Sequence, residues 1–149
     1  MIAFDTNVLI YGQQAGDDPR HHRAIELLYA ASATSAIMPL QVLGEFLNVC
    51  TRKLGWTPSD AIEQTDEYAD LFNCPETKLD DLIEAANLAS NHDLQFFDAL
   101  IVAVAANSGA TMLLSEDMHD GLEIAGLRIV NPFNPENRRA IESLLASSG

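Results

Sequence analysis

The stretch Met1-Ile2-Ala3-Phe4-Asp5-Thr6-Asn7 begins the chain with four apolar residues and then places a carboxylate directly after them. A short uncharged run of this kind predicts a buried β-strand over residues 1–4. Burial of an unpaired carboxylate at the end of that strand would cost on the order of several kcal/mol or force its protonation. Asp5 is therefore expected either to have a partner or to cap the following turn as an Asx-type residue.

Three further acidic residues follow or interrupt apolar runs in the same way. Glu45 lies within Val42-Leu43-Gly44-Glu45-Phe46-Leu47, Asp98 follows Phe96-Phe97, and Asp117 comes just after Met112-Leu113-Leu114-Ser115-Glu116. Taken alone, Glu45 is explained by a charge on a helix face and Asp117 by a turn. The ordered set of four, with few basic residues nearby, instead favours a divalent cation held by oxygen ligands. Such a site points to phosphodiester chemistry.

Around these acids, strand-like and helix-like patterns alternate along the chain. Strands are predicted over residues 1–4, 35–38, 111–114 and 127–130, and helices over 18–32, 39–53, 57–72, 79–91, 96–106 and 136–146. Asp18-Pro19 and Thr57-Pro58 each combine an N-cap residue with a proline at the first helical position. In helix 79–91, Leu82, Ile83, Ala86 and Ala89 are in helical register and are expected to share its apolar face. Helix 96–106 is apolar almost all round and should lie in the core.

This alternation predicts an α/β fold in which a mostly parallel sheet is covered by helices on both faces. Ligands of open sheets bind where the carboxyl ends of the strands meet. Asp5 and Asp117 are expected at such ends, and Asp98 in the first turn of the buried helix, where the helix dipole favours an anion. With 149 residues, the chain is expected to form one domain over 1–149, its tail from about 134 being the least diagnostic part.

Composition narrows the class of protein. Apolar residues make up 48% and charged residues 20%, which is typical of a globular domain. Cys50 and Cys74 have no CxxC spacing and are expected to be reduced. No basic leader precedes an apolar stretch and no run reaches membrane-spanning length, so a soluble cytoplasmic protein is expected. The net charge of −14 disfavours a non-specific nucleic-acid coat protein, but it is compatible with a metal-dependent nuclease and with a basic protein partner.

Together, the four acidic blocks resemble the PIN domain, and within it the VapC-type toxin ribonucleases of bacterial and archaeal toxin–antitoxin pairs. The resemblance extends over residues 2–133. It implies a three-layer α/β/α sandwich, a Mg²⁺- or Mn²⁺-dependent endoribonuclease site, an RNA substrate, a cognate antitoxin and a homodimer. Asp5 and Asp98 would be the principal metal ligands, and Glu45 and Asp117 would complete the acidic pocket. Thr6, Asn7 and Ser115 match polar positions that support it.

Two other functions stay open from the residues alone. A receiver-like aspartate phosphotransferase module also has an acidic Mg²⁺ pocket, but it needs a lysine at a late strand end, and neither Lys53 nor Lys78 is placed there. A catalytically silent PIN-fold interaction module would keep the fold without the reaction. Retention of four clustered acids argues against it, because idle buried like charges destabilise a fold at neutral pH.

Two basic clusters also have two interpretations. Arg20-His21-His22-Arg23 could form a phosphate-contacting rim for RNA or a solvated helix start, and the solvated helix start is favoured. Arg138-Arg139 could contact substrate or pair with Glu136 and Glu142, and local pairing is favoured.

Overall fold

A small, mostly parallel sheet forms the centre of the protein, which a computed structural model describes over residues 1–148. Strands β1 (Ile2–Phe4), β2 (Met112–Leu114), β3 (Glu123–Ile124) and β4 (Leu127–Val130) lie in the order β1-β2-β4-β3. β1, β2 and β4 are parallel, and β3 is antiparallel to β4. The helices are α1 (Thr6–Gln13), α2 (Pro19–Ser32), α3 (Leu40–Arg52), α4 (Pro58–Leu71), α5 (Leu79–His92), α6 (Phe96–Asn107) and α7 (Arg138–Ser148).

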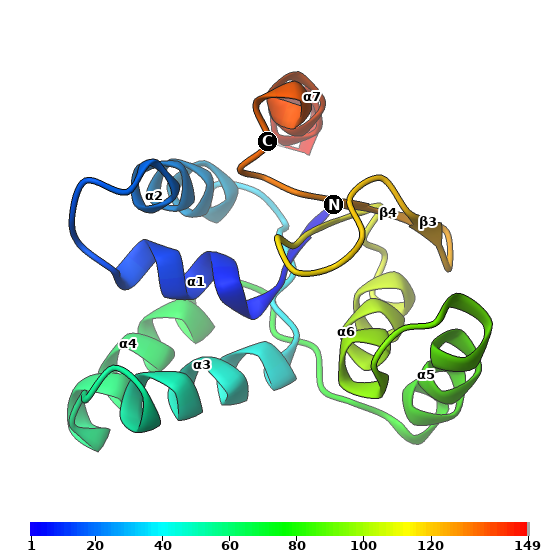
Figure 1. Cartoon of the computed structure of the whole chain (residues 1–149), viewed down its shortest axis with the longest axis horizontal. Helices are drawn as coiled ribbons and strands as arrows, with labels where there is room; N and C mark the ends of the chain where they lie inside the picture. Colours follow the sequence, from blue (N-terminus) through cyan, green and yellow to red (C-terminus); the bar gives the residue numbers. More distant parts are fainter. Residues whose placement is uncertain (149) are drawn as a thin grey trace.

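Helices lie on both sides of this sheet, with α6 below it and α7 above it in Figure 1. The predicted α/β class, a three-layer α/β/α sandwich around a mostly parallel sheet, is confirmed. Residues Ala99–Ala105 of α6 are all buried, as expected of a helix that is apolar all round. Among residues 1–148, no helix combines the length and hydrophobicity needed to cross a bilayer.

The strand register brings the ends of three segments to one edge of the sheet. Phe4 pairs with Leu114, and Leu114 pairs with Val130. One residue further, the Asp5 N–H donates to the Leu114 carbonyl at 3.0 Å and the Ser115 N–H donates to the Val130 carbonyl at 3.0 Å. Because all three parallel strands end here, Asp5 and Ser115 leave the sheet side by side.

The prediction of a strand over residues 35–38 is wrong, because the segment forms no continuous ladder. Only Ile37 forms bridges, one with Ala3 and one with Asn73, both parallel. The segment therefore lies beside β1 where a fifth strand would be, but it pairs at a single residue. Pro39 explains why pairing stops, because proline has no N–H to continue a ladder and it directly precedes α3.

Two elements were not predicted from the sequence. Helix α1 begins immediately after β1, with the Asp5 carboxylate accepting from the Thr6 N–H as its N-cap. Its Val8-Leu9-Ile10 run has no clear helical period, so the helix could not be recognised from the sequence. The two-residue strand β3 was also missed. The last helix begins at Arg138 rather than Glu136, since Pro135–Asn137 forms a 3₁₀ turn capped by Asn134.

The buried face of α5 matches the predicted one only at Ala89, which packs against α6. Asp81 and Ala85 face inward, whereas Leu82 is 39% exposed and Ile83 56% exposed. Asp81 accepts from the Lys78 N–H at 2.8 Å and from Asn107 Nδ2 of α6 at 2.7 Å. Ala85, Leu88 and Ala89 pack beside Asp81 against the apolar residues of α6, so the row of Leu79, Leu82 and Ile83 faces outward.

Candidate active site

A cleft of about 520 Å³ opens at the carboxyl edge of the sheet, between α1, α3, the start of α6 and the segment after β2. The four acids predicted from the sequence, Asp5, Glu45, Asp98 and Asp117, all line it. Within the described chain, its lining also includes Glu116 and contains no lysine, arginine or histidine. The fold therefore gathers carboxylates from four separate segments around one space with no basic side chain on its wall.

Asp5 is the most buried of the four, with only 6% of the residue exposed. The Thr6 N–H donates to its Oδ1 and the Ser115 hydroxyl donates to its Oδ2, each at 2.7 Å. The pKa of Asp5 is raised from 3.8 to about 6. Burial is the largest cause, the hydrogen bonds from Ser115 and Thr6 act in the opposite direction, and the nearby charges of Asp98 and Glu45 add to the rise. Asp5 is thus held rigidly while its charge lacks a countercharge.

Glu45 is held by side chains from two directions. The Thr6 hydroxyl donates to Glu45 Oε2 at 2.6 Å, which ties α3 to α1. Gln41 Nε2 lies 3.5 Å from Glu45 Oε1 and donates to the Phe97 carbonyl of α6 at 3.0 Å. The sequence contains a signal for Gln41 that was missed, since positions 41 and 45 are one helical turn apart.

Asp98 and Asp117 face the cleft from its other side. Asp98 is half-buried in the first turn of α6, and burial together with repulsion from Glu45 and Asp117 raises its pKa. Asp117 is exposed and follows Ser115 by two residues. The structure therefore places Asp117 on a rim beyond the end of β2 rather than directly at the strand end.

Glu116 is a fifth carboxylate of the cleft that the sequence did not single out. The Tyr11 hydroxyl donates to its Oε1 at 2.7 Å, and Arg20 Nη1 donates to its Oε2 at 3.3 Å. The Glu116 N–H donates to Asn7 Oδ1 at 3.4 Å. Asn7, one of the predicted supporting residues, therefore also lines the cleft. Glu116 and Asp117 are adjacent, and the sequence alone does not indicate which of the two pairs with an arginine.

The donor set is chemically suited to a hard cation. No three His, Cys, Asp or Glu side chains among residues 1–148 converge closely enough to enclose an ion by themselves. Mg²⁺ needs only one or two carboxylates, with water and substrate oxygen atoms completing its shell. The cleft offers oxygen donors alone, and the raised pKa of Asp5 marks negative charge that a cation would neutralise. This arrangement fits a cation bound by two of the acids and by water better than one enclosed by all four.

A family model described as the PIN domain matches residues 2–119. The chain belongs to the PIN domain family. The match contains all four predicted acids together with Thr6, Asn7 and Ser115, and it confirms the predicted resemblance. A search of curated protein sequences found no significant match to this PIN protein.

Solved PIN-fold structures resemble the chain over most of its length. A toxin–antitoxin complex from Klebsiella pneumoniae matches with a TM-score of 0.67 and 22% identity, covering 89% of this chain and 98% of that one. VapC20 from Mycobacterium tuberculosis, described as a sarcin-ricin loop cleaving toxin, matches at 0.64 and 23%, covering 78% and 92%. FitAcB from Neisseria gonorrhoeae matches at 0.66 and 15%, covering 90% and 99%. At these identities the likeness concerns the fold.

Proposed function

We propose that this PIN protein is a Mg²⁺- or Mn²⁺-dependent endoribonuclease and the toxin component of a type II toxin–antitoxin pair. The observation that carries the proposal is the cleft in which four acids from separate segments meet with no basic side chain in the lining. The similar structures support it, since one belongs to a toxin–antitoxin complex and another is described as a sarcin-ricin loop cleaving toxin. The receiver-like alternative has no support, because neither Lys53 nor Lys78 lines the cleft.

In this proposal, Asp5 and Asp98 would hold the cation, and Glu45 and Asp117 would complete the pocket directly or through water. A divalent cation, when bound, supplies a water of lowered pKa and neutralises charge on the phosphate. The protein supplies rigid positions: Ser115 and the Thr6 N–H orient both oxygen atoms of Asp5, and the Thr6 hydroxyl orients Glu45. Attack of water on the phosphorus of the RNA phosphodiester would break its bond to the 3′-oxygen, leaving a 5′-phosphate on one product and a 3′-hydroxyl on the other.

The direct test is cleavage of total RNA and of defined stem-loops by purified protein, with Mg²⁺ or Mn²⁺ and with EDTA. We expect discrete RNA fragments carrying 5′-phosphates with either metal and intact RNA with EDTA. If folded protein cuts no RNA with either metal, the nuclease proposal fails and the silent interaction module takes its place.

Ser115→Ala is expected to move the acid limb of the cleavage pH profile to higher pH. The Ser115 hydroxyl lowers the pKa of Asp5, so its removal raises the pH at which Asp5 becomes the carboxylate that binds a cation. The measurement is kcat/KM from about pH 5 to 8 at saturating Mg²⁺. Ser108→Ala, on the short link between α6 and β2, serves as the control, and an acid limb that stays in place in Ser115→Ala would show that Ser115 does not tune Asp5.

The proposed antitoxin would cover the acidic cleft. A net charge of −14 and a cleft without basic lining complement a basic segment on that partner. Such a segment would neutralise the carboxylates in place of the cation. We therefore expect the co-expressed antitoxin to inhibit RNA cleavage, and its removal to restore cleavage.

The proposed homodimer would cover the outward apolar row of α5. Leu79, Leu82 and Ile83 lie three and four residues apart, so they share one helix face, and Leu79 is 71% exposed. Ile83→Glu is expected to convert a dimer into a monomer, because a two-fold contact would bury both introduced charges. Light scattering after gel filtration gives the mass. Ile62→Glu, at a 50% exposed position on α4, should leave the mass unchanged, and a dimer that survives Ile83→Glu would show that α5 is not its interface.

A further inference from the structure

We propose that a second pocket, lined by arginines, holds a phosphate of the RNA strand whose scissile phosphate lies in the acidic cleft; the inference rests on the proposed nuclease function. The pocket has a volume of about 190 Å³ and lies between the start of α2 and the segment that leads into α7. It is lined by Pro19, Arg20, Arg23, Pro132, Phe133, Asn134, Pro135 and Arg138. Three of the 8 basic residues of the chain meet there, and no acidic residue is part of the lining.

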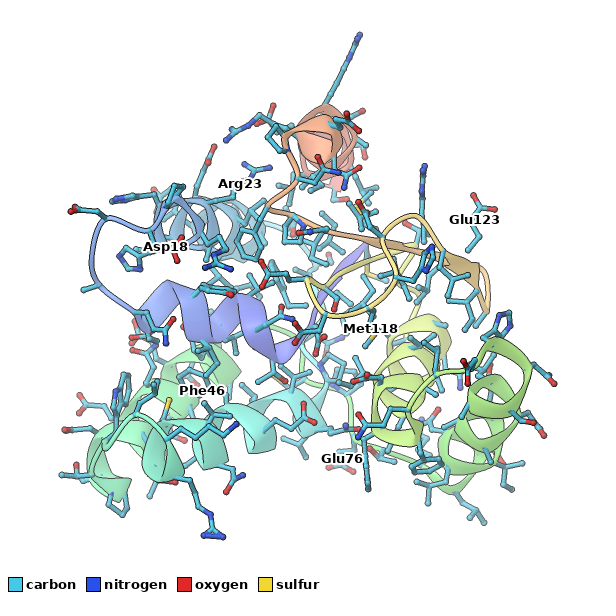
Figure 2. All side chains as sticks on the ribbon, in the orientation of Figure 1. Asp18, Arg23, Phe46, Glu76, Met118 and Glu123 are labelled. Atoms are coloured by element: carbon cyan, nitrogen blue, oxygen red, sulfur yellow. The ribbon has the colours of Figure 1, made fainter. Side chains whose placement is uncertain are left out.

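Arg23 provides the observation that points to a ligand. The residue is only 8% exposed and lies between α2 and α7 (Figure 2). Its Nη1 pairs with Glu26 at 3.1 Å and its Nε donates to the Pro132 carbonyl at 3.3 Å. Its Nη2 is buried and, within residues 1–148, has no hydrogen-bond partner. Arg23 lines the pocket, a buried guanidinium nitrogen without an acceptor is costly, and the arginine fork matches phosphate oxygens.

Arg138, the first residue of α7, contributes a second donor to the pocket. Its Nη1 is shared between Glu26 at 3.2 Å and Glu142 at 3.1 Å, and half of its side chain is exposed. Within the described chain, both contacts use Nη1 alone, so its other nitrogen atoms can donate to an anion. Glu142 also lies 3.9 Å from Arg23 Nη1, so the same carboxylate competes with a bound phosphate for both arginines.

Arg20 connects this pocket to the acidic cleft. It lines the pocket, and its Nη1 donates to Glu116 of the cleft. Its guanidinium lies 4.5 Å above the ring of Tyr11, which lines the cleft and packs edge-on against Phe133 at 5.1 Å. The two pockets are therefore neighbours, linked by the contacts of Arg20 with Glu116 and Tyr11. This adjacency favours a neighbouring phosphate of the bound strand over an acidic segment of a protein partner.

The test compares two neighbouring residues of α7 that carry the same charge. Binding of a labelled single-stranded RNA is measured by fluorescence anisotropy in EDTA over a range of salt concentrations. Arg138→Gln is expected to weaken binding about tenfold and to reduce the slope of log K against log salt by about 0.7. Arg139→Gln, whose residue is exposed and does not line the pocket, should stay within about twofold of wild type.

A gain of affinity separates phosphate binding from a merely structural ion-pair cluster. Glu142→Gln removes one of the two competing carboxylates, the other being Glu26, and is expected to tighten RNA binding about threefold. Glu63→Gln on α4 makes the same change of net charge and should not tighten binding. Arg23→Lys keeps the positive charge and removes the forked guanidinium, so it should weaken RNA binding. A thermal melt of this variant, run in parallel, shows whether it is folded. If Arg23→Lys unfolds, the Arg138 and Glu142 variants still decide the matter.

Several outcomes would overturn the phosphate pocket. Equal weakening by Arg138→Gln and Arg139→Gln would mean that only overall charge matters. Unchanged RNA binding combined with lost binding of a glutamate-rich peptide would assign the pocket to a protein partner. A wild-type protein that binds no RNA would also refute it. If Arg138 governs RNA binding in a protein that cleaves nothing, the pocket stands and the nuclease falls. If the protein cleaves RNA and Arg138→Gln binds it as wild type does, the nuclease stands and the pocket falls.

Discussion

Asp98→Asn is expected to lower the rate of metal-dependent RNA cleavage by a factor on the order of 10³ or more while leaving the fold intact. Asp98 lies half-buried in the first turn of α6 and faces the charges of Glu45 and Asp117. Asparagine keeps the size of the side chain and removes the charge that a cation requires. Initial rates on a defined stem-loop with Mg²⁺, alongside a thermal melt, give both quantities.

Asp66→Asn on α4 is the matched control, since it makes the same chemical change at an exposed position outside the cleft. It should cut RNA at the wild-type rate. An Asp98→Asn protein that is folded and still cuts RNA at that rate would place the chemistry elsewhere. An Asp98→Asn protein that unfolds would show that Asp98 serves the structure of α6.

Asp5→Asn is expected to abolish cleavage and, in EDTA at neutral pH, to raise the free energy of unfolding by about 3 kcal/mol. The pKa of Asp5 rises from 3.8 to about 6 in the folded protein, so the folded state binds this proton more tightly than the unfolded state. The Asp5 contribution therefore favours folding at low pH and is lost as pH rises from about 4 to about 6. Asparagine stays neutral and does not show this loss.

Urea denaturation at about pH 4 and about pH 7.5 measures the difference, with Asp66→Asn as the exposed control. The gain from Asp5→Asn should appear at the higher pH and vanish at the lower one. Mg²⁺ should stabilise the wild type at neutral pH and have little effect on the variant, because binding to the folded state alone raises stability. Equal stability of the two proteins at both pH values would show that Asp5 already has its countercharge.

The candidate site could be predicted from sequence to the extent that its residues interrupt apolar runs. Asp5, Glu45 and Asp98 each follow or break a hydrophobic segment, and the structure places all three in one cleft. Partnerships across the fold could not be predicted in this way. The bond from Thr6 to Glu45 spans 39 positions, and no local pattern indicates it. The hydrogen bond from Arg20 to Glu116, which joins residues 96 positions apart, could not be predicted for the same reason.

The fold could be predicted where periodicity is strong or caps are explicit, and less well where tertiary contacts decide. Pro58 and Pro19 mark helix starts that the structure confirms. Helix α1 has too little periodicity to be recognised, and its formation depends on the Asp5 cap and on packing against α2 and α3. On α5, Ala85 and Ala89 pack on α6 beside the hydrogen-bonded Asp81, and this contact turns Ile83 outward.

The hydrogen bond between Ser115 and Asp5 joins residues 110 positions apart, and this separation governs when the cleft exists during synthesis. A ribosome has released Asp5 and Glu45 long before Asp98 and Asp117 are made. Until the segment around Ser115 emerges, β1 has no β2 to pair with and Asp5 has no anchor. A prematurely terminated chain therefore carries half of the carboxylates and no assembled cleft.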